Sequence, residues 1–180
     1  MLYFRNEIID KYDSTYKLEK AIEEKKIFKI KYGLYSDEEF VGMLEIISKV
    51  YPDAILTSDS AYYYHDLTDV IPDLYYLATA RNYTRIDDEN IKQIFVANDL
   101  LNAGKMTMEI ESTTVNIYNK ERLLVELIRK RNQIPFDYYK EIIINYRHQI
   151  EDLDVYKIQE YVSLYPNEEL LLDIIQREVF

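Results

Sequence analysis

The sequence predicts an α+β fold in two parts: a short module of two helices and a β-hairpin, followed by a body with a mixed sheet, several packed helices and a helical C-terminus. Apolar residues recur at helical spacing near both ends of the chain, whereas runs rich in β-branched and aromatic residues fill its middle. The 180 residues include only three glycines and four prolines, so most of the chain should lie in regular elements. This length allows one main core with a small module attached.

Two helices are predicted at the N-terminus. The first covers residues 2–11, where Phe4, Ile8 and Ile9 lie at helical spacing. Asp13 and Ser14 then supply turn and N-cap residues for a second helix. The apolar face of that helix consists of Leu18, Ala21 and Ile22. Its polar front, which points away from this face or lies at the exposed start, consists of Thr15, Tyr16, Lys17 and Lys20.

A β-hairpin is predicted in residues 27–36, IFKIKYGLYS. Apolar residues mix here with Lys29 and Lys31, and Gly33 lies where two short strands need a turn with positive φ. Two helices followed by such a hairpin are typical of a winged helix-turn-helix. We therefore expect this hairpin to be the wing.

The body is predicted to begin with a helix over residues 38–50, which ends before Pro52. Strands are predicted over residues 54–57, 74–79, 91–96, 106–110 and 113–118, the last two forming a hairpin. A helix with the sequence AYYYHDL, capped by Ser58 or Ser60, separates the first two strands. The remaining chain is predicted to be helical over residues 120–131, 136–151, 155–164 and 168–178, with Asn167 capping the last helix.

Charge divides the chain between the module, residues 1–36, and the body, residues 37–180. The module has 8 basic and 6 acidic side chains, net +2, while the body has 14 basic and 27 acidic ones, net −13. An acidic body with a mildly basic head fits a protein that touches DNA through one end only. The alternative is a uniformly acidic solvated surface with local variation.

Several classes of site are not expected. The apolar runs are too short to cross a bilayer and the N-terminus does not look like a secretion signal, so we expect a cytoplasmic protein with no membrane partner. The absence of cysteine and the presence of only two histidines make a metal site unexpected. The three glycines are too scattered for a phosphate-binding loop or a dinucleotide fingerprint, so no cofactor is expected either.

The candidate catalytic residues favour structural roles. His65 could act as a general base, but no partner is positioned beside it by sequence, and a buried, hydrogen-bonded histidine is the better interpretation. Glu121 and Arg122 could form an acid and a clamp, yet Glu121 also suits the first turn of a helix. The nineteen tyrosines favour core and interface packing over base stacking, which also needs a basic groove. We therefore expect no catalytic residues and no enzyme activity.

Several short strings occur in a specific order along the chain. They are Gly33-Leu34-Tyr35, Ser60-Ala61 followed by His65, Leu67 and Thr68, Ile71-Pro72, and Glu121-Arg122-Leu123-Leu124. With the order of the predicted elements, they resemble the AbiEi antitoxin family of type IV toxin–antitoxin systems, which defend bacteria against phage by abortive infection. Two features depart from the family pattern: the N-terminal module looks one helix short, and Asp66 stands where a glycine more often follows the histidine.

This resemblance implies a repressor of its own operon that binds inverted repeats in the promoter DNA. It also implies functional pairing with a nucleotidyltransferase-type toxin, for which direct contact is not required. A homodimer on a palindromic site would strengthen DNA binding. The alternative from another class is an acidic protein-interaction module that neutralises a toxin without binding DNA.

The helix-turn-helix geometry identifies the residues expected to contact DNA. The N-terminal residues of the second helix reach the base edges of the major groove, and here they are Thr15, Tyr16, Lys17 and Lys20. Ser14 and the helix N-terminus would hold a phosphate, while Lys29 and Lys31 on the wing would add charge without reading sequence. The alternative for the four lysines is an ordinary solvated face.

Overall fold

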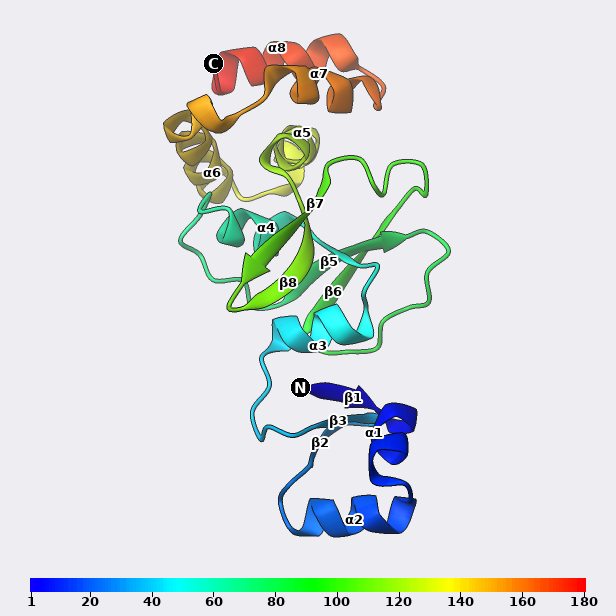
Figure 1. Cartoon of the computed structure of the whole chain (residues 1–180). Coiled ribbons are helices and arrows are strands. Elements are labelled where there is room, and N and C mark those ends of the chain that lie inside the picture. Colours follow the sequence, from blue (N-terminus) through cyan, green and yellow to red (C-terminus); the bar gives the residue numbers. More distant parts are fainter. The chain divides into compact units, whose positions relative to one another are not determined.

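The computed structural model describes all 180 residues, which form two compact units, Met1–Pro52 and Asp53–Phe180 (Figure 1). We call them the N-terminal unit and the C-terminal unit. The fold is α+β with eight α-helices, as the sequence predicts. The units divide after Pro52 rather than after residue 36, because the helix expected to open the body belongs to the N-terminal unit.

The N-terminal unit is built on a small antiparallel sheet with the strand order β1-β3-β2. Its elements are β1 (Leu2–Phe4), α1 (Arg5–Tyr12), α2 (Thr15–Glu23), β2 (Phe28–Lys31), β3 (Leu34–Ser36) and α3 (Met43–Val50). The prediction of a helix from residue 2 is wrong for its first three residues. They form β1 instead, because Leu2 pairs with Ser36 and Phe4 with Leu34.

Apolar side chains cover both faces of this sheet, because successive residues of a strand point to opposite sides. On one face, Tyr3 and Tyr35 pack against the buried residues Ile8, Leu18, Ala21 and Ile27, most of them in α1 and α2. On the other face, Leu2 and Leu34 pack against Ile46 of α3. Within this unit, α3 therefore covers the sheet face that α1 and α2 leave open (Figure 1).

Local backbone chemistry sets the start of α2 and the turn of the hairpin. Asp13 adopts a left-handed conformation, with φ 59°. The Ser14 hydroxyl oxygen accepts a hydrogen bond from the Lys17 N–H at 3.2 Å, so Ser14 caps α2 as predicted. Gly33 has φ +75° between β2 and β3, which glycine adopts without steric cost.

The C-terminal unit contains a five-stranded mixed sheet with the order β6-β5-β4-β8-β7. The strands are β4 (Ile55–Leu56), β5 (Tyr75–Ala80), β6 (Ile91–Val96), β7 (Lys105–Ile110) and β8 (Thr113–Tyr118). β4 is parallel to β8 and β5 to β6, whereas the other two pairs are antiparallel. The predicted hairpin is the β7–β8 pair, whose turn residues Glu111 and Ser112 both have positive φ.

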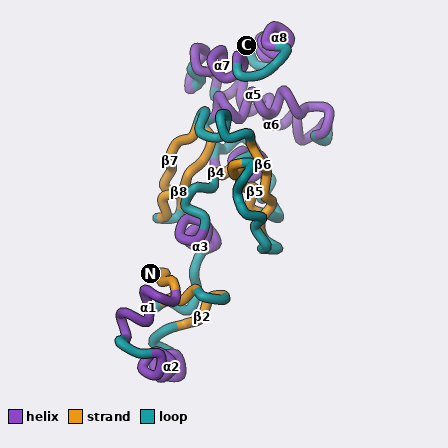
Figure 2. Tube along the Cα trace, turned by 90° about the vertical axis from the view of Figure 1, so that its right-hand side faces the viewer, coloured by secondary structure: helices purple, strands orange, loops and turns teal.

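Five helices complete this unit: α4 (Ser58–Tyr64), α5 (Lys120–Lys130), α6 (Phe136–His148), α7 (Val155–Ser163) and α8 (Glu168–Glu178). The central helix is α5, which packs against α4, α7 and α8 (Figures 1 and 2). Asn167 occupies the predicted N-cap position of α8, in a left-handed conformation and without a side-chain cap bond. None of the helices combines the length and apolar composition that crossing a bilayer requires.

The loop between β6 and β7 approaches α5 closely at Gly104, which has φ +79°. A Cβ atom there would lie 2.4 Å from the Cβ of Arg122 and 2.8 Å from Oδ1 of Asn119. Gly104→Ala should lower the free energy of unfolding by at least about 2 kcal/mol, because the strain of a left-handed alanine adds to the overlap. Urea denaturation followed by circular dichroism measures this loss. Gly42→Ala, whose added Cβ meets nothing within 4 Å, is the control, and an equal loss in both variants would contradict the prediction.

Candidate functional site

The residues expected to contact DNA all lie in the N-terminal unit. At the start of α2, Thr15, Tyr16 and Lys17 are exposed, and 76% of Tyr16 is accessible to solvent. Lys20 is exposed one turn later, whereas Leu18 is buried against α1. The amphipathic character of α2 therefore orients its polar front outward, as its sequence predicts.

The lysines of α2 have carboxylate neighbours in the same segment. Lys17 Nζ lies 3.2 Å from Oδ2 of Asp13, and Lys20 Nζ lies 3.9 Å from Oε1 of Glu24. A hydrogen bond from Lys26 and its charge lower the pKa of Glu24. All these groups are exposed, and solvent screening leaves such pairs with little net energy. A lysine of this kind can exchange its carboxylate partner for a phosphate group at small cost.

The two hairpin lysines lie on different faces of the small sheet. Lys29 pairs with Tyr35 and therefore shares the face covered by α1 and α2. A register shift follows Lys29, and Lys31 pairs instead with Leu34 on the opposite face. Its ammonium lies over the ring of Tyr51, 5.3 Å from the centroid. Of the two lysines, only Lys29 lies on the sheet face that α1 and α2 cover.

A second site lies in the C-terminal unit, centred on Arg122 of α5. Only 1% of Arg122 is exposed, and its Nη2 donates a hydrogen bond to Oε1 of Glu126 at 3.0 Å. The guanidinium lies over the rings of Tyr118 and Tyr165, with centroid distances of 5.3 and 5.4 Å. Its Nε and Nη1 atoms are buried without a hydrogen-bond partner. Two charged donors of this side chain are therefore left unsatisfied by the protein.

Glu126 is the acidic partner of several cations. Besides Arg122, it contacts Arg129 at 3.0 Å, Lys130 at 3.5 Å and the Tyr165 hydroxyl at 2.7 Å. Burial opposes its ionisation, but Lys130, Tyr165 and the two arginines outweigh burial and lower the pKa of Glu126. Burial raises the pKa of Tyr118 to about 12, so its hydroxyl stays protonated at neutral pH. The carboxylate of Glu126 is therefore ionised and shared among its donors.

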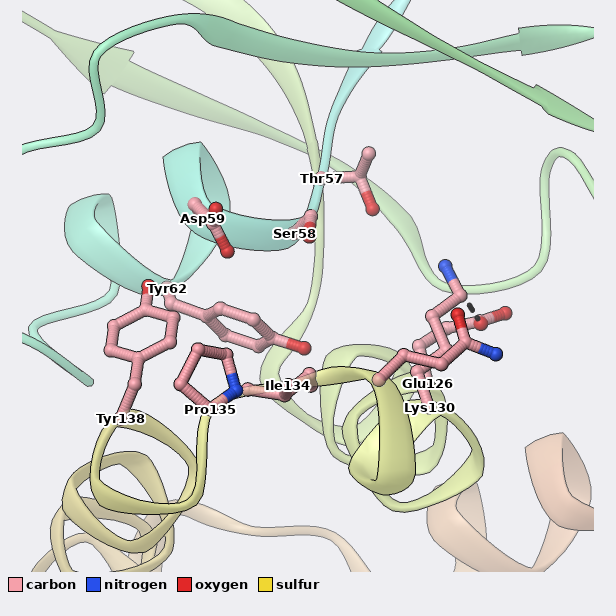
Figure 3. A pocket seen from close by; sticks show the side chains of 10 residues that line it. Thr57, Ser58, Asp59, Tyr62, Glu126, Lys130, Ile134, Pro135 and Tyr138 are labelled. Atoms are coloured by element: carbon pink, nitrogen blue, oxygen red, sulfur yellow. Dashed lines mark ion pairs between the residues drawn. The ribbon is translucent and has the colours of Figure 1, made fainter.

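Two cavities adjoin these side chains. The arginine cavity, about 300 Å³, is lined by Arg122 and, among others, by Arg81, Arg129, Phe95 and Leu100. The tyrosine cavity, about 220 Å³, is lined among others by Asp59, Tyr62 and Tyr138. The residues shared by both cavities are Thr57, Glu126 and Lys130. Figure 3 shows the tyrosine cavity, with the Glu126–Lys130 ion pair on one side and the two tyrosines on the other.

The other candidate catalytic residues have structural partners. His65 is buried, and its Nε2 lies 2.8 Å from the Tyr118 carbonyl oxygen. Burial lowers the pKa of His65, so the ring is neutral at pH 7. Glu121 lies in the first turn of α5, and its Oε1 accepts a hydrogen bond from the Asp154 N–H at 3.0 Å. The structural interpretation of both residues is confirmed.

The Arg122 site was not predicted from the sequence, although part of its signal is local. Arg122, Glu126 and Lys130 follow one another at four-residue spacing, which places charges along one side of a helix whose other residues are mostly apolar. Arg81 and Tyr165 come from distant segments. Their contribution depends on tertiary packing, which the helix pattern does not contain.

Glu126→Gln should lower the free energy of unfolding by about 3 kcal/mol at pH 7, because it leaves the buried Arg122 charge unpaired. The pKa of Glu126 is lower in the folded state than its ordinary value of 4.5, so its contribution is present above that value and is lost as the pH falls through the folded pKa. The difference between wild type and variant should therefore shrink in acid. Chemical denaturation between pH 7 and pH 3 measures it. Glu160→Gln, at an exposed position of α7, is the control, and equal pH dependence in both variants would refute this role of Glu126.

Comparison with known proteins identifies no relative of this chain. No family model matches the sequence, and no curated protein is significantly similar to it. The expected relation to AbiEi antitoxins therefore rests on short sequence segments and the element order alone. The two sites themselves supply the argument for function.

Proposed function

We propose that this chain is an AbiEi-like antitoxin that represses its own operon by binding promoter DNA through the N-terminal unit. The observation that supports this proposal is the exposed, capped start of α2, where Thr15, Tyr16 and Lys17 project from a helix fixed by a buried apolar face. A helix N-terminus offers N–H groups and a positive dipole end to phosphate, and its side chains can enter the major groove.

The order of elements in the N-terminal unit supports a winged helix-turn-helix. α1 and α2 are separated only by Asp13 and Ser14, and the β2–β3 hairpin follows α2. In this proposal α2 is the recognition helix and the hairpin is the wing. β1 pairs with β3, so the hairpin is hydrogen-bonded to the start of the chain within the N-terminal unit.

Each candidate residue then has a specific role. Tyr16, Lys17 and Lys20 face the base edges and the flanking phosphates, while Ser14 holds the helix start in place through its cap bond. Lys29, on the sheet face shared with α2, adds a phosphate contact from the wing. Lys31, beside Tyr51, contributes charge from the opposite face. A homodimer on inverted repeats would double these contacts, and the regulated operon would encode a nucleotidyltransferase-type toxin.

Lys17→Ala combined with Lys20→Ala should weaken binding to the upstream promoter by about tenfold and flatten its salt dependence, because each phosphate contact releases counterions. Gel shifts at several salt concentrations measure both effects. Lys140→Ala, which removes an exposed charge from α6, is the matched control. Unchanged affinity and salt slope in the double variant would refute the proposed interface.

Asp13→Asn combined with Glu24→Gln should have the opposite effect. These carboxylates lie 3.2 and 3.9 Å from the Lys17 and Lys20 ammonium groups, so their removal frees both lysines and reduces repulsion of the DNA backbone. We expect affinity to rise several-fold at low salt and the gain to fall as salt screens the charges. Fluorescence anisotropy with labelled promoter DNA measures this change. Glu160→Gln is the control, and no gain in the double variant would mean that the polar front of α2 does not face the duplex.

The net charge of the C-terminal unit favours a second candidate function. This unit contains 23 acidic and 13 basic side chains, net −10. Such a surface suits an interaction module that engages a basic toxin without binding DNA. Salt-sensitive co-purification with the toxin, together with the absence of any promoter complex, would favour this alternative over repression.

A further inference from the structure

We propose that the arginine cavity of the C-terminal unit binds a small phosphate monoester, such as a mononucleotide. The first observation is charge. Four basic side chains, Arg81, Arg122, Arg129 and Lys130, line a cavity that has a single carboxylate, Glu126. They are four of the 13 basic side chains in a unit whose net charge is −10. Four cations grouped in one cavity of a negatively charged unit create a local positive field, and this field attracts an anion.

The second observation is the unsatisfied side of Arg122. The rings of Tyr118 and Tyr165 lie beside the guanidinium, with their centroids 5.3 and 5.4 Å from its Cζ atom, and offer no hydrogen-bond acceptor in its plane. Nη2 is bonded to Glu126, whereas the buried Nε and Nη1 have no partner. Leaving charged donors unpaired in the interior is costly, and an oxyanion bound beside Arg122 would satisfy one of them with a charge-assisted hydrogen bond.

Glu126 does not pair with the two free donors of Arg122, Nε and Nη1. Its two oxygens already receive the Arg122, Arg129 and Lys130 cations and the Tyr165 hydroxyl. One negative charge therefore faces three positive ones, and Arg81 adds a fourth on the cavity wall. A doubly charged phosphate balances this excess better than a carboxylate does.

The rest of the wall favours a phosphate attached to a flat or apolar group. Phe95, Leu100 and Tyr165 line the cavity, and Arg129 lies 3.6 Å from the centroid of the Tyr165 ring. A volume of about 300 Å³ reaches the lower end of the range for small-molecule sites. Thr57 also lines the adjoining tyrosine cavity, where Tyr62, Tyr138 and Asp59 add polar groups suited to a sugar or base.

Isothermal titration of the full chain with inorganic phosphate, AMP and adenosine tests the proposal. We expect AMP to bind saturably at millimolar or lower concentration, phosphate to compete with it, and adenosine to bind at least about tenfold more weakly than AMP, because the charged contacts are lost. Binding of phosphate and AMP with equal affinity would show that the site recognises the phosphate group alone. Tighter binding of AMP would identify the attached nucleoside as part of the ligand.

Arg81→Gln and Arg129→Gln should each weaken AMP binding about tenfold, and both positions are accessible enough for the variants to fold. Lys140→Gln, which removes an exposed charge outside the cavity, should bind AMP as the wild type does. Lys17→Ala should also bind AMP normally, which separates this site from the DNA interface. The absence of saturable binding of phosphate and AMP to folded wild-type protein would overturn the proposal. Equal affinity in wild type and both arginine variants would overturn it as well.

Discussion

The C-terminal unit depends on the burial of a charged helix. α5 packs against α4, α7 and α8, and its residues Glu121 to Val125 are all buried. An ionised side chain removed from water must be paired and hydrogen-bonded, or it destabilises the fold. Neighbouring elements meet this demand in part: Glu126, one turn beyond Arg122, pairs with it, and the rings of Tyr118 and Tyr165 lie beside the guanidinium. The Nε and Nη1 atoms of Arg122 have no partner.

The N-terminal unit solves a different problem, that of covering a very small sheet. Three short strands cannot form a core alone, so α1 and α2 cover one face and α3 covers the other. In this arrangement the apolar residues of α2 are buried against the sheet, and its charged side is exposed to water. Recognition in this unit would therefore depend on exposed, weakly paired lysines. The C-terminal site instead contains a buried cation, Arg122, that is bonded to Glu126.

Regular elements with a strong local pattern were predictable from the sequence. The strands Ile91–Val96 and Thr113–Tyr118 and the helix Glu168–Glu178 have the predicted bounds, because β-branched and aromatic residues mark the strands and helical spacing marks the helix. The local pattern predicts a helix over Leu2–Phe4, because the strand that pairs with it lies thirty or more residues away, beyond any local window. The exposed front of α2 followed from amphipathicity. The environment of Arg122 did not, since it is assembled from Arg81, Tyr118 and Tyr165 by packing alone.

The position of α3 also determines which segment of the chain could be transferred to another protein by recombination and still fold. Ile46 covers the same sheet face as Leu2 and Leu34, so a fragment ending at Ser36 would present those two buried leucines to water and to other exposed strands. Recombination that keeps the N-terminal unit folded would therefore fuse another domain after Pro52. A fragment that stopped at the hairpin would therefore tend to aggregate.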